Sequence, residues 1–126
     1  MKKLILALAS ILMVCLIAGC VGEVKTYTDS GRAISTGVNQ EFVIALGSNP
    51  TTGYMWQESY DEDMLKLLES KYEMGEEAKQ GVVGAGGVDY FRFKTLNKGE
   101  TEITMVYKRP WEEEILDQKV FTVDIK

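Results

Sequence analysis

Residues 100–109 read ETEITMVYKR, and this stretch decides the fold because its apolar and polar side chains alternate. Ile103, Met105 and Tyr107 fall on one face of an extended chain, while Thr104 and Lys108 fall on the other. A period of two is typical of a β-strand with one buried and one solvated face, and it does not fit a helix. The stretch therefore predicts a strand of a sheet that covers a core.

The same period recurs in four other segments: EFVIALG from residue 41, YMWQESY from 54, VDYFRFKTL from 88 and KVFTVDIK from 119. They are short, rich in β-branched and aromatic residues, and separated by turn residues such as NKGE at 97–100. This pattern predicts an all-β sandwich, in which one face of each strand is buried. The side chains expected to share the alternating apolar faces are Phe42, Ile44, Leu46, Tyr54, Trp56, Phe91, Phe93, Ile103, Met105, Tyr107, Phe121, Val123 and Ile125.

Two segments do not follow the alternation. In DEDMLKLLESKYEM, residues 61–74, Asp61 could cap a helix that runs through Leu68. In an otherwise all-β chain we prefer a single helical turn at Asp61–Met64, followed by a strand to about Met74. The sequence GEEAKQGVVGAGG, residues 75–87, reads as a long, polar, glycine-rich connection.

The N-terminus predicts export and attachment to a membrane. Lys2 and Lys3 precede an unbroken apolar run, which is the pattern of a secretory signal peptide over residues 1–19. Residues 17–20, IAGC, resemble a prokaryotic lipobox, which implies cleavage before Cys20 and a lipid on its sulfur. The alternative is an uncleaved transmembrane anchor, because the run approaches the ~20 residues that span a bilayer. We expect residues 20–37 to carry the lipid and form a tether, and residues 38–126 to form the domain. A short strand around Val24–Thr28 within the tether is left open.

Composition excludes several classes of function. The chain has no histidine, and its two cysteines, Cys15 and Cys20, lie in the signal and at the lipid site. A triad of the Ser-His or Cys-His kind cannot be built, and we expect no metal, no cofactor and no enzymatic activity. Without Lys2 and Lys3, 12 basic residues remain against 19 acidic ones, which argues against nucleic acid.

The stretch NPTTGY between two apolar strands has more turn residues than a plain turn needs. Pro50 fixes its own φ and restricts Asn49, and Gly53 permits a positive φ before the next strand. Thr51 and Thr52 therefore stand at the tip of a stiff loop. Taken alone, this loop favours the interpretation of a rigid turn without further function.

Two further loops carry unusual residues. The first is GAGG, residues 84–87, whose nearly bare backbone suits either a tight hairpin tip or close approach to a partner. The second is YKRPWEEE, where Trp111 stands at the tip of a polar loop. Exposed Trp and Arg are enriched in binding hot spots, although Trp111 could also fold back onto the sandwich.

Together these three loops make the chain resemble the chagasin family of cysteine protease inhibitors over roughly residues 38–126. The motifs that carry the resemblance, in order, are Asn49-Pro50-Thr51-Thr52-Gly53-Tyr54, Gly84-Ala85-Gly86-Gly87 and Arg109-Pro110-Trp111. The resemblance implies an eight-stranded, immunoglobulin-like β-sandwich with the three loops at one end. It also implies that these loops enter the active-site cleft of papain-like cysteine proteases and inhibit them reversibly. It places the NPTTGY tip at the catalytic cysteine, the glycine-rich loop along one side of the cleft, and Arg109 and Trp111 along the other.

Two alternatives remain at this point. An adhesive or carbohydrate-binding surface lipoprotein would need aromatic residues aligned on a sheet face or in a cleft. A structural component of the cell envelope would be favoured only by a buried Trp111. The expected state is an extracytoplasmic monomer, held at the membrane through the lipid on Cys20.

Overall fold

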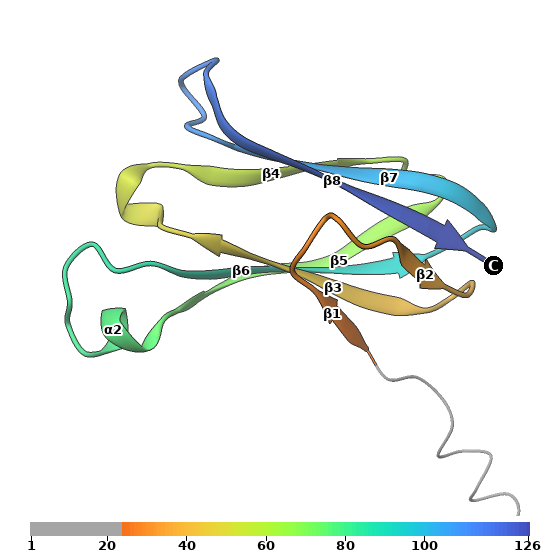
Figure 1. Ribbon diagram of the computed structural model, residues 1–126, viewed down its shortest axis with the longest axis horizontal. Coiled ribbons are helices and arrows are strands. Elements are labelled where there is room, and N and C mark those ends of the chain that lie inside the picture. Colours follow the sequence, from red (N-terminus) through yellow and green to blue (C-terminus); the bar gives the residue numbers. More distant parts are fainter. Residues whose placement is uncertain (1–23) are drawn as a thin grey trace, which may run out of the picture.

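The computed structural model describes residues 24–126, which form a sandwich of two four-stranded sheets (Figure 1). The expected signal peptide and Cys20 lie outside the described residues. Eight strands are present: β1 Lys25–Tyr27, β2 Ile34–Thr36, β3 Glu41–Ser48, β4 Met55–Tyr60, β5 Leu65–Met74, β6 Gly87–Thr95, β7 Gly99–Lys108 and β8 Ile115–Ile125. Two short helical segments complete the fold: the 3₁₀ turn η1, Pro50–Thr52, and the helix α2, Glu76–Lys79. Within residues 24–126, no helix has the length and apolar character needed to cross a membrane.

The first sheet has the strand order β1-β3-β6-β5, and the second sheet has the order β2-β8-β7-β4. β5 and β6 form an antiparallel hairpin within the first sheet, and β7 and β8 form one within the second. The connection between β3 and β4 passes from one sheet to the other. The all-β sandwich predicted from the alternating pattern is thus confirmed.

The core lies between the sheets and is built from the alternating residues. All the predicted inward positions except Tyr54 and Tyr107 are buried, and these two are partly buried. Phe42 and Phe93, paired across β3 and β6, stack with ring centroids 5.7 Å apart. Such pairs add to the burial of apolar area, which contributes roughly 25 cal/mol per Å². The core also includes Ile34 and Leu65, both of which are almost fully buried.

Two segments of the predicted tether belong to the sandwich instead. β1 pairs in parallel with β3, and β2 pairs in parallel with β8. Ile34, in β2, has no exposed surface. A tether over the whole of residues 20–37 is therefore wrong for residues 25–27 and 34–36, which are strands of the sheets. The strand left open around residues 24–28 is present as β1. The sequence did not predict β2, because its three residues are too few for the alternation to be visible.

The ambiguous segment after β4 adopts the preferred arrangement. Met64 and Leu65 donate their backbone N–H groups to the Asp61 carbonyl, both at 3.0 Å, which closes a single turn. The strand β5 then runs to Met74, as expected. The following connection, described from the sequence as long, polar and glycine-rich, contains the one-turn helix α2.

Candidate functional site

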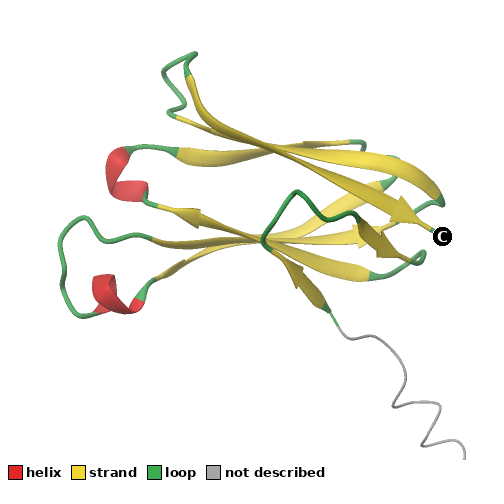
Figure 2. Ribbon diagram, in the orientation of Figure 1, coloured by secondary structure: helices red, strands yellow, loops and turns green. Residues whose placement is uncertain are grey.

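The three loops singled out in the sequence lie at the same end of the sandwich. Loop 1, residues 49–54, joins β3 to β4; loop 2, residues 75–86, joins β5 to β6; loop 3, residues 109–114, joins β7 to β8. The residues next to the loops are paired on neighbouring strands. In the first sheet Gly87 pairs with both Ser48 and Met74, and in the second sheet Lys108 pairs with both Met55 and Ile115. Figure 2 shows both short helical segments at this end, which we call the loop end. Proximity of the three loops therefore follows from strand pairing.

Loop 1 is stiffened by its own polar side chains. The Asn49 Oδ1 atom accepts hydrogen bonds from the Thr51 N–H, at 3.3 Å, and from the Thr51 hydroxyl, at 2.6 Å. The Thr52 hydroxyl donates to the Asn49 carbonyl at 2.6 Å. Gly53 ends the 3₁₀ turn with φ of 84°, a conformation that glycine adopts without strain. Thr51 and Thr52 are exposed, and their hydroxyl groups hold the loop in shape.

Loop 2 is tied to loop 1 by the same asparagine. The Asn49 Nδ2 atom donates to the Gly84 carbonyl at 2.6 Å, across 35 residues of sequence. Gly86 passes so close to loop 1 that a Cβ atom there would lie 2.5 Å from the Ser48 carbonyl oxygen. Ala85 between them is partly buried. The two loops therefore form one surface, and that surface depends on a glycine at position 86.

Gly87 is in the first position of β6 and is also needed for close approach. A Cβ atom at Gly87 would collide with the Glu73 carbonyl oxygen of the neighbouring strand β5. A side chain here would therefore push the β5–β6 hairpin apart where loop 2 begins and ends. Gly87 supports the site through strand packing, whereas Gly84 and Gly86 lie on the side of loop 1.

Arg109 connects loop 3 to loop 1. Its Nε atom donates to the Thr52 carbonyl at 3.0 Å, and its guanidinium group lies over the Tyr54 ring, 4.5 Å from the centroid. Glu112 accepts a further hydrogen bond from Nη1 at 3.4 Å. A guanidinium group over a tyrosine face gains a cation–π attraction. The resemblance implied that Arg109 grips a partner, but in the free protein this side chain is engaged in positioning the loops.

Trp111 is the large aromatic residue presented at the loop end. It is 71% exposed, and Pro110 beside it is exposed as well. The edge of its ring rests on Gly53, where an added Cβ atom would lie 2.7 Å from the Trp111 Cη2 atom. The exposure removes the observation that would have favoured a purely structural envelope protein. Trp56 is the buried tryptophan, and its Nε1 atom donates to the Gly47 carbonyl at 2.9 Å.

Tyr107 and Asp89, which the sequence did not assign to the site, lie in the strands next to the loops. The Tyr107 hydroxyl accepts a hydrogen bond from the Asn49 N–H at 3.0 Å, and the Tyr107 ring packs against Tyr54 and Trp56 at 5.4 and 4.8 Å. Burial raises the pKa of Asp89, and a hydrogen bond with Ser48 offsets part of this rise. The alternation of β7 predicted that Tyr107 faces inward, but it carried no sign of this hydrogen bond.

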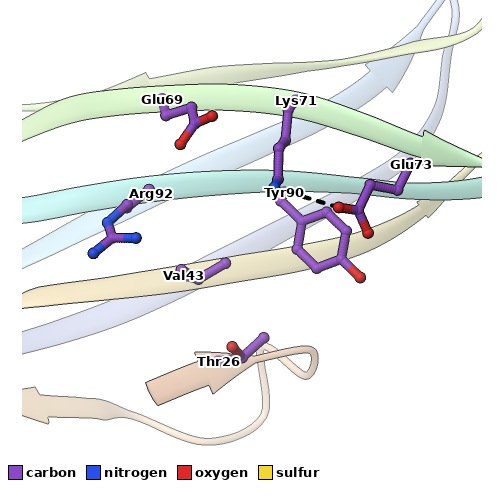
Figure 3. A pocket seen from close by; sticks show the side chains of 7 residues that line it. All are labelled: Thr26, Val43, Glu69, Lys71, Glu73, Tyr90 and Arg92. Carbon is purple, nitrogen blue, oxygen red and sulfur yellow. Dashed lines mark ion pairs between the residues drawn. The ribbon is translucent and has the colours of Figure 1, made fainter. Parts of the chain in front are cut away.

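A groove on the outer face of the first sheet is separate from the loop end (Figure 3). It has a volume of about 280 Å³ and is lined by Thr26, Val43, Glu69, Lys71, Glu73, Tyr90 and Arg92. Its cations are already paired, Lys71 with Glu73 at 3.3 Å and Arg92 with Glu41 at 2.7 Å, and the Glu41 pair raises the Arg92 pKa further. Tyr90 is the single aromatic residue among the lining side chains. This groove therefore does not provide the row of aligned aromatic side chains that a carbohydrate-binding platform would need.

The fold and the loop end define a class of protein: an all-β sandwich that presents three cross-connected loops at one end. The family model for the chagasin family peptidase inhibitor I42 matches residues 35–125. Chagasin from Trypanosoma cruzi is 33% identical over 107 residues, which cover 80% of this chain and 94% of that protein. Amoebiasin-1 from Entamoeba histolytica is 32% identical over 92 residues, covering 73% of this chain and 84% of the relative. The chain belongs to the chagasin family.

The solved structures agree with this assignment. The crystal structure of a cysteine protease inhibitor from Entamoeba histolytica has a TM-score of 0.67 and 28% identity, and the match covers 82% of this chain and 98% of that one. The protein is thus an inhibitor of papain-like cysteine proteases and not an enzyme. The family and the sandwich expected from the three motifs are both confirmed.

Proposed function

We propose that the loop end is the inhibitory surface and that it enters the active-site cleft of the protease as one rigid wedge. Loop 1, with Thr51 and Thr52 at its tip, meets the catalytic cysteine. Loop 2 follows one wall of the cleft through its backbone, and Trp111 of loop 3 covers the other wall. The observation that carries this proposal is the pair of cross-connections from loop 1, through Asn49 to loop 2 and through Arg109 to loop 3.

Those connections favour tight binding because they fix the loops before the protease arrives. Ordering a flexible side chain at an interface costs about 0.5–1.5 kcal/mol, and a surface that is already ordered avoids part of this cost. Asn49 and Arg109 have already lost their freedom in the free protein, since both side chains are hydrogen-bonded to neighbouring loops. Three adjacent loops on a small sandwich can supply the ~800 Å² that one partner contributes to a standard interface.

Inhibition by this surface needs no chemistry from the inhibitor. The sequence has no histidine, and residues 24–126 contain no cysteine, so this part of the chain cannot form a nucleophilic pair of the Ser-His or Cys-His kind. The protease is blocked because its cleft is filled. We therefore expect reversible inhibition that competes with substrate, by a monomer bound to one protease.

We further propose that the protein acts outside the cytoplasm, anchored by a lipid on Cys20. The support is the sequence pattern of residues 1–20, with two lysines, an apolar run and IAGC. Replacing Cys20 by serine should move the protein from the membrane fraction to the soluble fraction and abolish the lipid mass on the mature N-terminus. Retention of Cys20→Ser in the membrane would favour an uncleaved anchor.

The experiment that tests the wedge is a titration of papain with the full chain in mild detergent, using a fluorogenic peptide substrate. We expect tight, reversible and substrate-competitive inhibition. The test variant is Asn49→Ala, which removes the connection to loop 2 and the hydrogen bonds that the Asn49 side chain makes within loop 1. This variant should remain folded and inhibit papain more weakly than the wild type does. Inhibition that is non-competitive, or unaffected by Asn49→Ala, would contradict the proposed surface.

A further inference from the structure

Exposed apolar side chains are concentrated around the loop end. Among the residues described, ten large hydrophobic side chains are substantially exposed, and seven of them lie in the three loops or at the strand ends beside them. These seven are Met55, Met74, Val82, Val83, Trp111, Ile115 and Leu116. The tip of loop 1 between them is polar, with Asn49, Thr51 and Thr52. The loop end therefore has a polar centre and apolar flanks.

Val82 and Val83 are the most unusual of these residues. They are 51% and 99% exposed, so Val83 has essentially no contact that screens it from water. Neither residue belongs to the motif GAGG that follows. A valine that is exposed to this degree contributes nothing to the core, and two in succession at the tip of a functional loop form a small apolar surface without a partner in this chain.

The position of the two valines is fixed by the backbone of loop 2. The Val82 N–H donates to the Glu77 carbonyl of α2 at 3.1 Å, and the Ala85 N–H donates back to the Val82 carbonyl at 3.4 Å. The Gly84 carbonyl, one residue further along, accepts the hydrogen bond from Asn49. Valine itself has a stiff side chain with few rotamers. The valine tip, Val82 and Val83, would therefore lose little conformational entropy on contact with a partner.

The valine tip and Trp111 lie in loops that connect strands of different sheets. Loop 2 connects strands of the first sheet, and loop 3 connects strands of the second, with loop 1 crossing between them (Figure 1). Packed sheets lie about 10 Å apart. A protease that receives the tip of loop 1 in its cleft would thus meet an apolar group on each side, Trp111 on one wall and the valine tip on the other.

We propose that the valine tip is a second apolar anchor, which contacts an apolar patch on the cleft wall opposite the wall that Trp111 covers. The contact selects, among papain-like cysteine proteases, those whose wall is apolar at that point. This inference rests on the proposed function, because it takes the loop end as the surface that meets the protease. It adds a determinant outside the three motifs.

The test compares the double variant Val82→Ala/Val83→Ala with Val120→Ala in the full chain. Val120 is a matched control, since it is an exposed valine in the middle of β8, away from the loop end. If about half of the removed methyl surface is buried in the complex, the inhibition constant against a protease with an apolar wall should rise about tenfold. Val120→Ala should leave it unchanged, and thermal unfolding should be the same for all three proteins.

A panel of papain-like proteases that differ in the polarity of this wall supplies the second readout. The loss caused by the double variant should be large for apolar walls and small for polar ones. An unchanged inhibition constant throughout the panel would overturn the anchor, and an equal loss for every protease would overturn the selectivity. Trp111→Ala separates this inference from the proposed function. If Trp111→Ala weakens inhibition and the double valine variant does not, only the role of the valine tip as an anchor is refuted. If neither variant weakens inhibition, the proposal that the loop end is the inhibitory surface is refuted as well.

Discussion

Gly86→Ala should separate loop 2 from loop 1, and the cost can be worked out from the geometry. The new Cβ atom would lie 2.5 Å from the Ser48 carbonyl oxygen and 3.3 Å from the Asn49 Cβ atom. Carbon and oxygen in close contact are normally at least about 3.3 Å apart, so one backbone must move by roughly 0.8 Å. Because the obstacle is a carbonyl group and not the end of a flexible side chain, rotation of a side chain cannot relieve it.

Forcing extra atoms into a packed region costs about 1–3 kcal/mol. The shift also stretches the hydrogen bond from Asn49 to the Gly84 carbonyl, now 2.6 Å, which contributes about 1 kcal/mol. We therefore expect Gly86→Ala to lower the free energy of unfolding by about 2–4 kcal/mol. Domains of this size are stable by about 5–15 kcal/mol, so the variant should remain folded at room temperature.

The assay is urea unfolding followed by tryptophan fluorescence, since the buried Trp56 reports the loss of the core. Gly47→Ala is the control, because an added Cβ at Gly47 meets nothing within 4 Å. The control should unfold within ~0.5 kcal/mol of the wild type, as surface substitutions generally do, and it should inhibit papain normally. Gly86→Ala should unfold earlier and inhibit more weakly. Equal midpoints for the two alanine variants would refute the steric reasoning.

Two further predictions concern the anchor residue and the ionisable group below the loops. Trp111→Ala should raise the inhibition constant against papain by about thirtyfold or more, because large aromatic residues at an interface contribute about 2 kcal/mol or more. Thr51→Ala should raise it less, and an equal or greater loss for Thr51→Ala would contradict this ranking. Folding raises the pKa of Asp89, so its native carboxyl group binds a proton more readily than in the unfolded chain, and stability should increase as the pH falls from the raised value towards 3.8. Asp89→Asn should therefore be more stable than the wild type at pH 7, and this difference in stability should shrink as the pH approaches about 4. The measurement is the unfolding midpoint of both proteins across this pH range. A constant difference between the two midpoints would show that ionisation of Asp89 is not the cause.

The interior of the sandwich could be predicted from the sequence because alternation is a local property. Phe91 and Phe93 alternate with polar neighbours, so a strand with one buried face is already visible in nine residues. The same is true of Phe121 and Val123 in β8. In each case the buried side follows from the period of two, whichever strand lies alongside.

The resemblance to the chagasin family supplied more than this pattern could. It identified which loops to consider together, and the family is confirmed. It did not indicate how the loops are held, because Asn49 and Gly84 are 35 residues apart and Arg109 and Thr52 are 57 apart. A residue type such as Arg or Asn carries no sign of whether it faces a partner or a neighbouring loop.

The sequence by itself determined the class of fold, the inward faces of the long strands and the three motifs, since each depends on residues that are close in the chain. The tertiary structure decided the rest. It paired the short strands β1 and β2 in parallel with β3 and β8, because three residues do not indicate which strand they will pair with. It also set the packing of Gly86 against loop 1, for the physical reason that a contact between distant segments exists only once the strands between them have paired.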